Sequence, residues 1–287
     1  MVRLKFSIEL NYDIDQPGCD FIFNVHVAQT KHQTIVKESL SMSQSLAPNF
    51  YTDPSTQTRF LRLKAFAGPL MLRYEATVDI DHDSAQPDQL SEVAVANLPG
   101  SVLPYIYPSR YCQSDRLHRF AVKEFGHLGR GYQRVQAIQQ WVTSHVRFLP
   151  NSSTGNTTAA DTLVEQVGVC RDFAHLMIAL CRAVNIPARF ATGIDYGADP
   201  ALGPTDFHAY VEAYVGERWY IFDPSGVAIP MGLVRFGTGR DAADSAFATM
   251  FGGVRGVAPT IQIEAVPNAQ GVLLVPHLVP YALSTDG

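Results

Sequence analysis

The sequence predicts an α+β fold: an N-terminal antiparallel β-sandwich, followed by a domain in which a helix that carries a cysteine packs on an antiparallel sheet. Residues 1–80 contain short runs of alternating apolar and polar residues, separated by Pro, Gly, Asn and Asp, which is typical of half-buried strands. Beyond residue 113, apolar residues recur at three-and-four spacing, which indicates helices. A chain of 287 residues fits two compact domains, and we predict them at residues 1–100 and 101–287.

Composition and charge narrow the possible partners. Hydrophobic residues make up 46% of the chain and charged residues 17%, so it can bury a large core. The net charge of −5 gives no electrostatic reason to expect a nucleic acid or an anionic membrane as a partner. No apolar run reaches the roughly 18–20 residues that a membrane-spanning helix needs. The N-terminal residues alternate and lack the apolar core of a signal peptide, so we expect a cytoplasmic protein.

The cysteines are too few for a disulfide scaffold, and none forms the close pair of a zinc site. We therefore expect free thiols, no metal site and no cofactor. The four cysteines are Cys19, Cys112, Cys170 and Cys181.

Five strands are expected in the N-terminal region, because their apolar residues repeat with period two. They are Val2–Leu10, Phe21–Val27, a run around Ile35 and Val36, Arg59–Phe66 and Leu70–Ile80. Residues 81–113 are rich in Pro and read as a connector with little regular structure.

Three helices are expected before the cysteine. The first begins at Ser114 as N-cap and ends at Gly126, and the second covers Tyr132–Val146. The polar loop Pro150–Thr158 follows, and then a short helix over Ala159–Val167.

A fourth helix organises the rest of the chain. Its apolar side chains, from Phe173 to Val184, repeat at helical spacing, and the pattern runs without a break from Cys170 to Pro187. Cys170 therefore lies at a helix N-terminus, where unpaired N–H groups and the helix dipole favour the nucleophilic thiolate. A reactive cysteine also needs a base, and the base needs an orienting acceptor.

A predicted hairpin over Asp206–Gly226 supplies both. A strand over Ala188–Ile194 and a loop over 195–205 precede it. If Gly216 lies in a two-residue turn, partners across the hairpin differ in parity, so His208 and Asp223 lie on one side, within reach of a hydrogen bond.

The C-terminal part gives weaker signals. Arg240–Gly252 is expected to contain a short helix, and Thr260–Val266 alternates like a closing strand.

The three side chains fit nucleophilic catalysis. Cys170 would attack a carbonyl carbon, His208 would act as general base and then acid, and Asp223 would hold the imidazole tautomer. Each residue alone has an ordinary structural explanation, since buried cysteines and strand histidines are common. Their compatible positions favour the candidate catalytic residues Cys170, His208 and Asp223.

These segments carry a family resemblance. GVCRDFAHLMIALCRAVNIPARFATG (Gly168–Gly193) and FHAYVEAYVGERWYIFDPSG (Phe207–Gly226) resemble the transglutaminase-like superfamily, whose papain-like core presents Cys, His and Asp in this order. YPSRYCQSDRL (Tyr107–Leu117) and GRDAADSAFATMFG (Gly239–Gly252) resemble the subgroup of microbial cysteine proteases with a bacterial transglutaminase-like N-terminal β-domain. The resemblance implies a papain-like fold for the second domain.

The expected activity is cysteine-dependent acyl transfer through a thioester, acting on an amide or isopeptide bond of a peptide or protein. We favour a hydrolase, because crosslinking requires a site that excludes water and binds an amine. Two alternatives stay open: a protein-glutamine transglutaminase, and a catalytically silent binding or scaffold protein. Tyr210, Trp219 and the Asn151–Thr158 loop either line the substrate cleft or are ordinary packing and surface residues.

Overall fold

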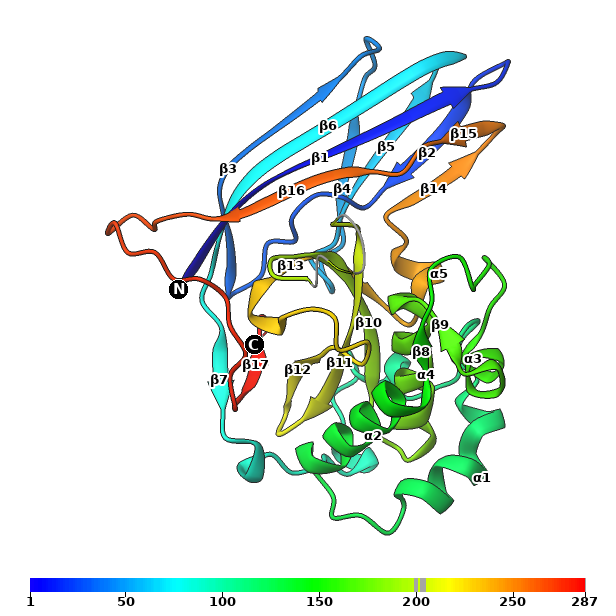
Figure 1. Ribbon diagram of the computed structural model, residues 1–287, viewed down its shortest axis with the longest axis vertical. Helices are drawn as coiled ribbons and strands as arrows, with labels where there is room; N and C mark the ends of the chain where they lie inside the picture. Colours follow the sequence, from blue (N-terminus) through cyan, green and yellow to red (C-terminus); the bar gives the residue numbers. More distant parts are fainter. Residues whose placement is uncertain (199–200, 202–204, 287) are drawn as a thin grey trace.

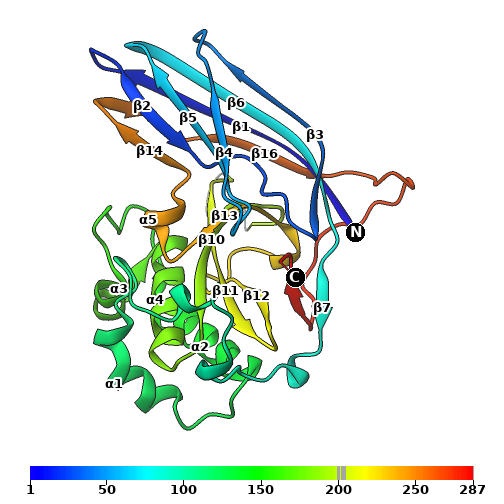
Figure 2. The same cartoon turned by 180° about the vertical axis from the view of Figure 1, so that it is seen from behind.

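The computed structural model describes residues 1–198, 201 and 205–286. A β-sandwich forms one end of the molecule, and a smaller antiparallel sheet with helices packed on it forms the other (Figures 1 and 2). Residues 199–200 and 202–204 of the loop predicted over 195–205 lie outside the described residues. The structure confirms the α+β fold class, with more strand than helix.

The sandwich consists of two antiparallel sheets. The first has the order β15-β1-β6-β3, with β16 also paired to β1, and the second has the order β14-β2-β5-β4. The strands are β1 (Val2–Ile14), β2 (Cys19–Phe23), β3 (Gln33–Met42), β4 (Asn49–Thr52), β5 (Arg59–Ala65), β6 (Gly68–Ile80), β14 (Ala248–Phe251), β15 (Val254–Gly256) and β16 (Thr260–Ala265).

Alternation along the strands builds the sandwich core. Every second residue of β1 from Val2 to Ile14 is buried, and β6 shows the same period from Leu70 to Ile80. These side chains share one hydrophobic cluster with the inward residues of β2 and β5. All five strands expected here are present, although the second ends at Phe23 instead of Val27. The structure adds β4, whose residues are all exposed and therefore give no alternating signal.

The chain returns to the sandwich near its C-terminus. β14 pairs with β2, and β15 and β16 pair with β1, so residues 248–265, which the sequence placed with the second domain, extend both sheets of the first region. The helix expected within Arg240–Gly252 is therefore only α5 (Ala242–Ser245). Ladder hydrogen bonds to β2 hold the residues after it in a strand. The strand expected over Thr260–Val266 is confirmed as β16.

The second region contains the four expected helices. They are α1 (Ser114–Phe125), α2 (Tyr132–His145), α3 (Ala159–Glu165) and α4 (Cys170–Ala183). Ser114 is the first helical residue rather than the cap, which is Gln113. The last helix ends at Ala183 instead of reaching Pro187, and α3 stops at Glu165 because Gln166 adopts a left-handed conformation.

The sheet of this region has the order β12-β11-β10-β13. Its strands are β10 (Ala188–Asp195), β11 (His208–Val215), β12 (Arg218–Phe222) and β13 (Leu233–Gly239). Alternate residues of β11, including Ala209, Val211 and Ala213, pack with α4 in one hydrophobic cluster. Burial covers α4 from Asp172 to Ala183 on every side, so this helix is the centre of the region.

Short elements complete the chain. A parallel bridge joins β8 (Arg147–Phe148) to β9 (Val167–Gly168) just before α4, and β7 (Asp83–Ala85) pairs with β17 (Ala282–Ser284). Among the described residues, 3-10 helices include Pro87–Gln89, Val95–Asn97, Leu103–Tyr105 and Pro230–Gly232. Among the described residues, no helix has the length and hydropathy needed to cross a membrane.

The two regions share a packed boundary. Ile194, Val234 and Phe236 belong to the hydrophobic cluster of the sandwich although they lie on β10 and β13. Gln33 also links β3 to β13, because its side-chain amide donates to the Arg235 carbonyl (2.8 Å) and accepts from the Arg235 N–H (2.9 Å). The end of β10 that approaches the candidate site is thus anchored against the sandwich.

Candidate active site

Cys170 is the first residue of α4 and is partly exposed, whereas Cys19, Cys112 and Cys181 are buried. Asp172, on the first turn, folds back and accepts a hydrogen bond from the Val169 N–H (2.9 Å). Gly168 leaves room for this side chain, since a Cβ there would come within 2.8 Å of the Asp172 Cβ. The predicted helix-start position is confirmed, and its first-turn N–H groups have no partner within the helix.

The polar loop before α3 lies beside the start of α4. Arg171, next to Cys170, donates to the Thr154 carbonyl (2.6 Å) and to the Ser153 hydroxyl (3.2 Å). The predicted Asn151–Thr158 loop is therefore attached to the helix turn that carries the thiol.

The hairpin has the predicted two-residue turn. Gly216 and Glu217 both have positive φ, and Val215 pairs with Arg218. The register pairs Val211 with Phe222, so His208 and Asp223 fall on the same side in diagonal positions. The His208 Nε2 and the Asp223 Oδ1 lie 3.2 Å apart, which confirms the contact expected from parity.

Asp223 is held by a network of donors. The Ser225 N–H (3.0 Å) and hydroxyl (2.6 Å) donate to its Oδ1, and the Ala228 N–H (2.9 Å) donates to its Oδ2. Burial alone would raise the pKa of Asp223, but the His208 charge and these hydrogen bonds hold the pKa below its usual value. The carboxylate is thus fixed and ionised beside the imidazole.

His208 lies between Asp223 and Cys170. Burial would lower the pKa of His208, but Asp223 and a hydrogen-bonding interaction with the Cys170 thiol together raise it well above its usual value. The Cys170 Sγ lies 4.0 Å from the carbonyl oxygen of Phe207, the residue before His208. The structure therefore brings all three sequence-predicted residues together.

Sequence reasoning missed one member of this cluster. Asp195, the last residue of β10, places its Oδ2 3.9 Å from the His208 Nδ1 and is 2% exposed. A prediction that β10 pairs with β11 would have found Asp195, because that pairing puts residues 193 and 208 opposite each other.

Tyr210 and Trp219 prove to be packing residues. Tyr210 is fully buried, and its ring meets the His208 ring edge-on with centroids 4.6 Å apart. Trp219 is 8% exposed, and the Cζ of the Arg189 guanidinium lies over its ring, 4.2 Å from the ring centroid. Tyr210 therefore supports the imidazole, and Trp219 belongs to a different cluster.

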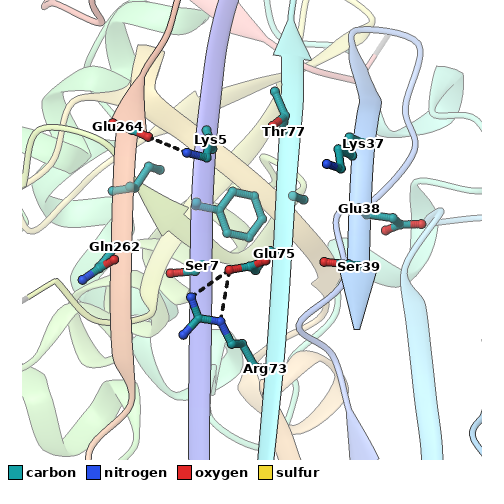
Figure 3. A pocket seen from close by; sticks show the side chains of 13 residues that line it. Lys5, Ser7, Lys37, Glu38, Ser39, Arg73, Glu75, Thr77, Gln262 and Glu264 are labelled. Carbon is teal, nitrogen blue, oxygen red and sulfur yellow. Dashed lines mark hydrogen bonds and ion pairs between the residues drawn. The ribbon is translucent and has the colours of Figure 1, made fainter. Parts of the chain in front are cut away.

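A pocket of about 480 Å³ lies elsewhere, on the outer face of the sandwich (Figure 3). Residues of β1, β3, β6 and β16 line it, and two ion pairs lie among them: Lys5 with Glu264 at 3.0 Å and Arg73 with Glu75 at 2.7 Å. It contains none of the three candidate catalytic residues. Within the described part of the chain, no group of three or more His, Cys, Asp or Glu side chains is arranged to hold a metal ion.

Comparisons with known proteins identify relatives of both regions of the chain. The family model described as "Transglutaminase-like superfamily" matches residues 121–224, a range that includes the three candidate residues. The model of "Bacterial transglutaminase, N-terminal domain" matches residues 2–101. A solved structure named a "Putative Cysteine Protease" from Cytophaga hutchinsonii is 38% identical, with a TM-score of 0.91 over 99% of this chain and 97% of that chain.

Curated relatives match over shorter stretches. The uncharacterized protein ML0607 of Mycobacterium leprae is 32% identical over 117 residues, which are 39% of this chain and 42% of that protein. The uncharacterized protein YebA of Bacillus subtilis is 23% identical over 143 residues, 42% of this chain and 19% of that protein. The chain thus spans less than half the length of these relatives.

Proposed function

Because this chain belongs to the transglutaminase-like superfamily, we propose that it is a cysteine-dependent acyl-transfer enzyme that hydrolyses an amide or isopeptide bond in a peptide or protein. The observation that carries the proposal is the position of His208. Its Nε2 faces Asp223, and its ring also interacts with Cys170, which is partly exposed while the other three cysteines are buried. The expected cytoplasmic location stays a prediction.

The chemistry proceeds in two steps. The Cys170 thiolate attacks the carbonyl carbon, His208 gives its proton to the leaving amine as the C–N bond breaks, and a thioester remains. Water then attacks the thioester, passes a proton to His208 and releases the acid together with the thiolate. Asp223 orients the ring and stabilises the imidazolium in both steps.

The start of α4 supports the tetrahedral intermediates. The N–H of Cys170 has no intrahelical partner and is directed along the helix axis, so it can donate to an oxyanion that forms on the substrate. The same helix end favours the negative sulfur.

The proposal is tested by labelling and turnover of matched variants. Cys181 lies on the same helix but is fully buried, and burial raises its pKa to about 12, so Cys181→Ala is the control for Cys170→Ala. We expect iodoacetamide at neutral pH to modify the wild type and Cys181→Ala at Cys170, and to leave Cys170→Ala unmodified. Intact-mass spectrometry measures the label, and thermal melts check that both variants fold.

Turnover separates hydrolysis from crosslinking. A library of glutamine, isopeptide and cell-wall peptide amides is incubated with each variant, with and without an added primary amine. Release of free acid, lost in Cys170→Ala and kept in Cys181→Ala, supports a hydrolase. Incorporation of the amine in place of water would replace that conclusion with a transglutaminase, and acid release by Cys170→Ala would refute the assignment of the nucleophile.

A further inference from the structure

Asp195 places a second carboxylate beside the His208 ring. Gly193 of β10 pairs with His208, so the side chain of Asp195, two residues further on, projects from the same face in a diagonal position. Its Oδ2 lies 3.9 Å from Nδ1, the nitrogen opposite the one that faces Asp223. The imidazole therefore has a buried carboxylate at each nitrogen.

The two carboxylates differ in how they are held. Asp223 accepts hydrogen bonds from Ser225 and Ala228, so its position is fixed. The Tyr210 hydroxyl and the Ala198 N–H interact with Asp195 and lower its pKa, but no donor among the described residues meets ordinary hydrogen-bond geometry at its Oδ1, although the residue is only 2% exposed. Asp195 can therefore still accept a hydrogen bond, and its Oδ2 faces Nδ1, the nitrogen of His208 that exchanges protons with the substrate in the proposed reaction.

Several titratable groups surround this carboxyl group. His208 and Tyr210 of β11 and Asp223 of the loop after β12 act on it directly. Cys170 of α4 acts on His208 and Tyr210, and Asp206, in the segment before β11, interacts with His208. Among them, His208 is the one group that becomes a cation.

We propose that Asp195 is a positioning residue that stabilises the His208 imidazolium through Nδ1 during deacylation. This inference rests on the proposed function, because it assigns Asp195 to one half of the same reaction.

The charge on sulfur distinguishes the two half-reactions. In the resting pair, the Cys170 thiolate itself attracts the Nδ1–H of the imidazolium. In the acyl-enzyme, the sulfur is part of a neutral thioester and no longer does so. When water attacks the thioester carbon, its proton moves to Nδ1 and an imidazolium forms, and the C–S electron pair returns to sulfur only when the intermediate collapses.

Asp195 is the acidic group within reach of Nδ1 at that moment. A separation of 3.9 Å is too long for a direct hydrogen bond, but a small rotation of the ring or one bridging water closes it. Burial raises the pKa of Asp195 to about 6, against the opposing effect of His208, so the carboxylate is available above that pH. Deacylation should therefore slow as the pH falls through about 6, where Asp195 takes up a proton.

The test uses Asp195→Asn, with Asp206→Asn as the matched control. Asp206 also acts on His208 electrostatically but is exposed. With a 4-nitrophenyl ester, which acylates thiols rapidly, we expect Asp195→Asn to keep the burst rate and lose about tenfold in the steady-state rate. Asp195→Glu should restore part of that loss, and Asp206→Asn should change neither phase. Asp195→Ser removes the charge if the amide variant does not fold.

A second measurement does not depend on turnover. The rate of Cys170 alkylation by iodoacetamide is followed against pH, and its upper transition reports the loss of the His208 proton. Asp195→Asn should move that transition to lower pH, and Asp206→Asn should move it less. An unmoved transition overturns the proposal, as does an equal fall of burst and steady state. A moved transition without any acyl transfer would instead refute the proposed function and leave the contact between Asp195 and His208 standing.

Discussion

Two buried polar clusters lie on the same face of β11 and differ in how their charges are balanced. His208 and Glu212 are separated by Tyr210 along one face, because side chains alternate along a strand. Around Glu212, Arg189 (2.6 Å) and Arg235 (3.2 Å) form ion pairs with its carboxylate. Asp286, near the C-terminus, pairs with both arginines, so the cations and carboxylates of this arginine cluster are equal in number.

The arginine cluster is closed, which means that its groups are buried and its charges are paired within it. Glu212, Arg189 and Arg235 are each at most 4% exposed. Burial would lower the pKa of Arg189, but Glu212 and Asp286 raise it above its usual value, so the guanidinium stays charged. Every charge here has an opposite charge in contact, which is the condition for a buried ion pair to be tolerated.

The cluster at His208 is open by comparison, because its charges are unequal in number and one of its groups is partly exposed. Two carboxylates face one imidazole, and one of them, Asp195, has the pKa raised to about 6 that burial beside another acid produces. On its remaining side lies a thiol that is partly exposed. In the arginine cluster, the equal numbers of cations and carboxylates hold Asp286 against β10 and β13. At His208, two carboxylates compete for one imidazole, so a proton can move between these groups.

The largest expected effect comes from breaking the open cluster. Asp223→Asn removes the charge that favours the imidazolium and the correct tautomer, and we expect kcat to fall by about 10³–10⁴-fold. The fold should remain, since the amide keeps the shape of the carboxylate. Steady-state kinetics with the substrate found for the wild type measure the loss, and a fall of less than about tenfold would remove Asp223 from the orienting role.

Breaking the closed cluster should affect stability instead. Glu212→Gln leaves two buried guanidinium groups with only Asp286 as counter-charge, and we expect the free energy of unfolding to drop by about 3–5 kcal/mol. Glu217→Gln, at the exposed turn of the same hairpin, is the control and should change it by no more than about 0.5 kcal/mol. Urea unfolding measures both. A loss below about 1 kcal/mol would mean that the cluster is not what holds β10, β11 and β13 together.

The smallest expected effect is a pH dependence of the free energy of unfolding that comes from Asp195. Burial raises the pKa of Asp195 from 3.8 to about 6, so the folded state binds this proton more tightly than the unfolded state does. The stabilising contribution of the protonated group is complete below about pH 4 and lost by about pH 6. Asp195→Asn avoids that loss and should exceed the wild type in stability by about 1–3 kcal/mol at pH 8. Urea unfolding at pH 5 and pH 8 checks this, and an equal difference at both pH values would contradict it.

The sequence by itself determined the local elements and the pairing of His208 with Asp223. Period-two alternation marked β1 and β6, helical spacing marked α4, and a Gly at a two-residue turn fixed the parity that brings His208 to Asp223. These features depend on residues close in the chain, or joined by one tight turn, so their geometry follows from backbone periods and turn chemistry.

Only the tertiary structure decided the partners that come from far along the chain. Asp195 reaches His208 because β10 pairs with β11 across a loop, and Asp286 reaches Arg189 because the C-terminal segment returns to β12. The short helix expected over Arg240–Gly252 became mostly strand because β2 offered a free edge to β14. No local period encodes which strand edge a distant segment will pair with, since that choice is made by the packing of the whole molecule.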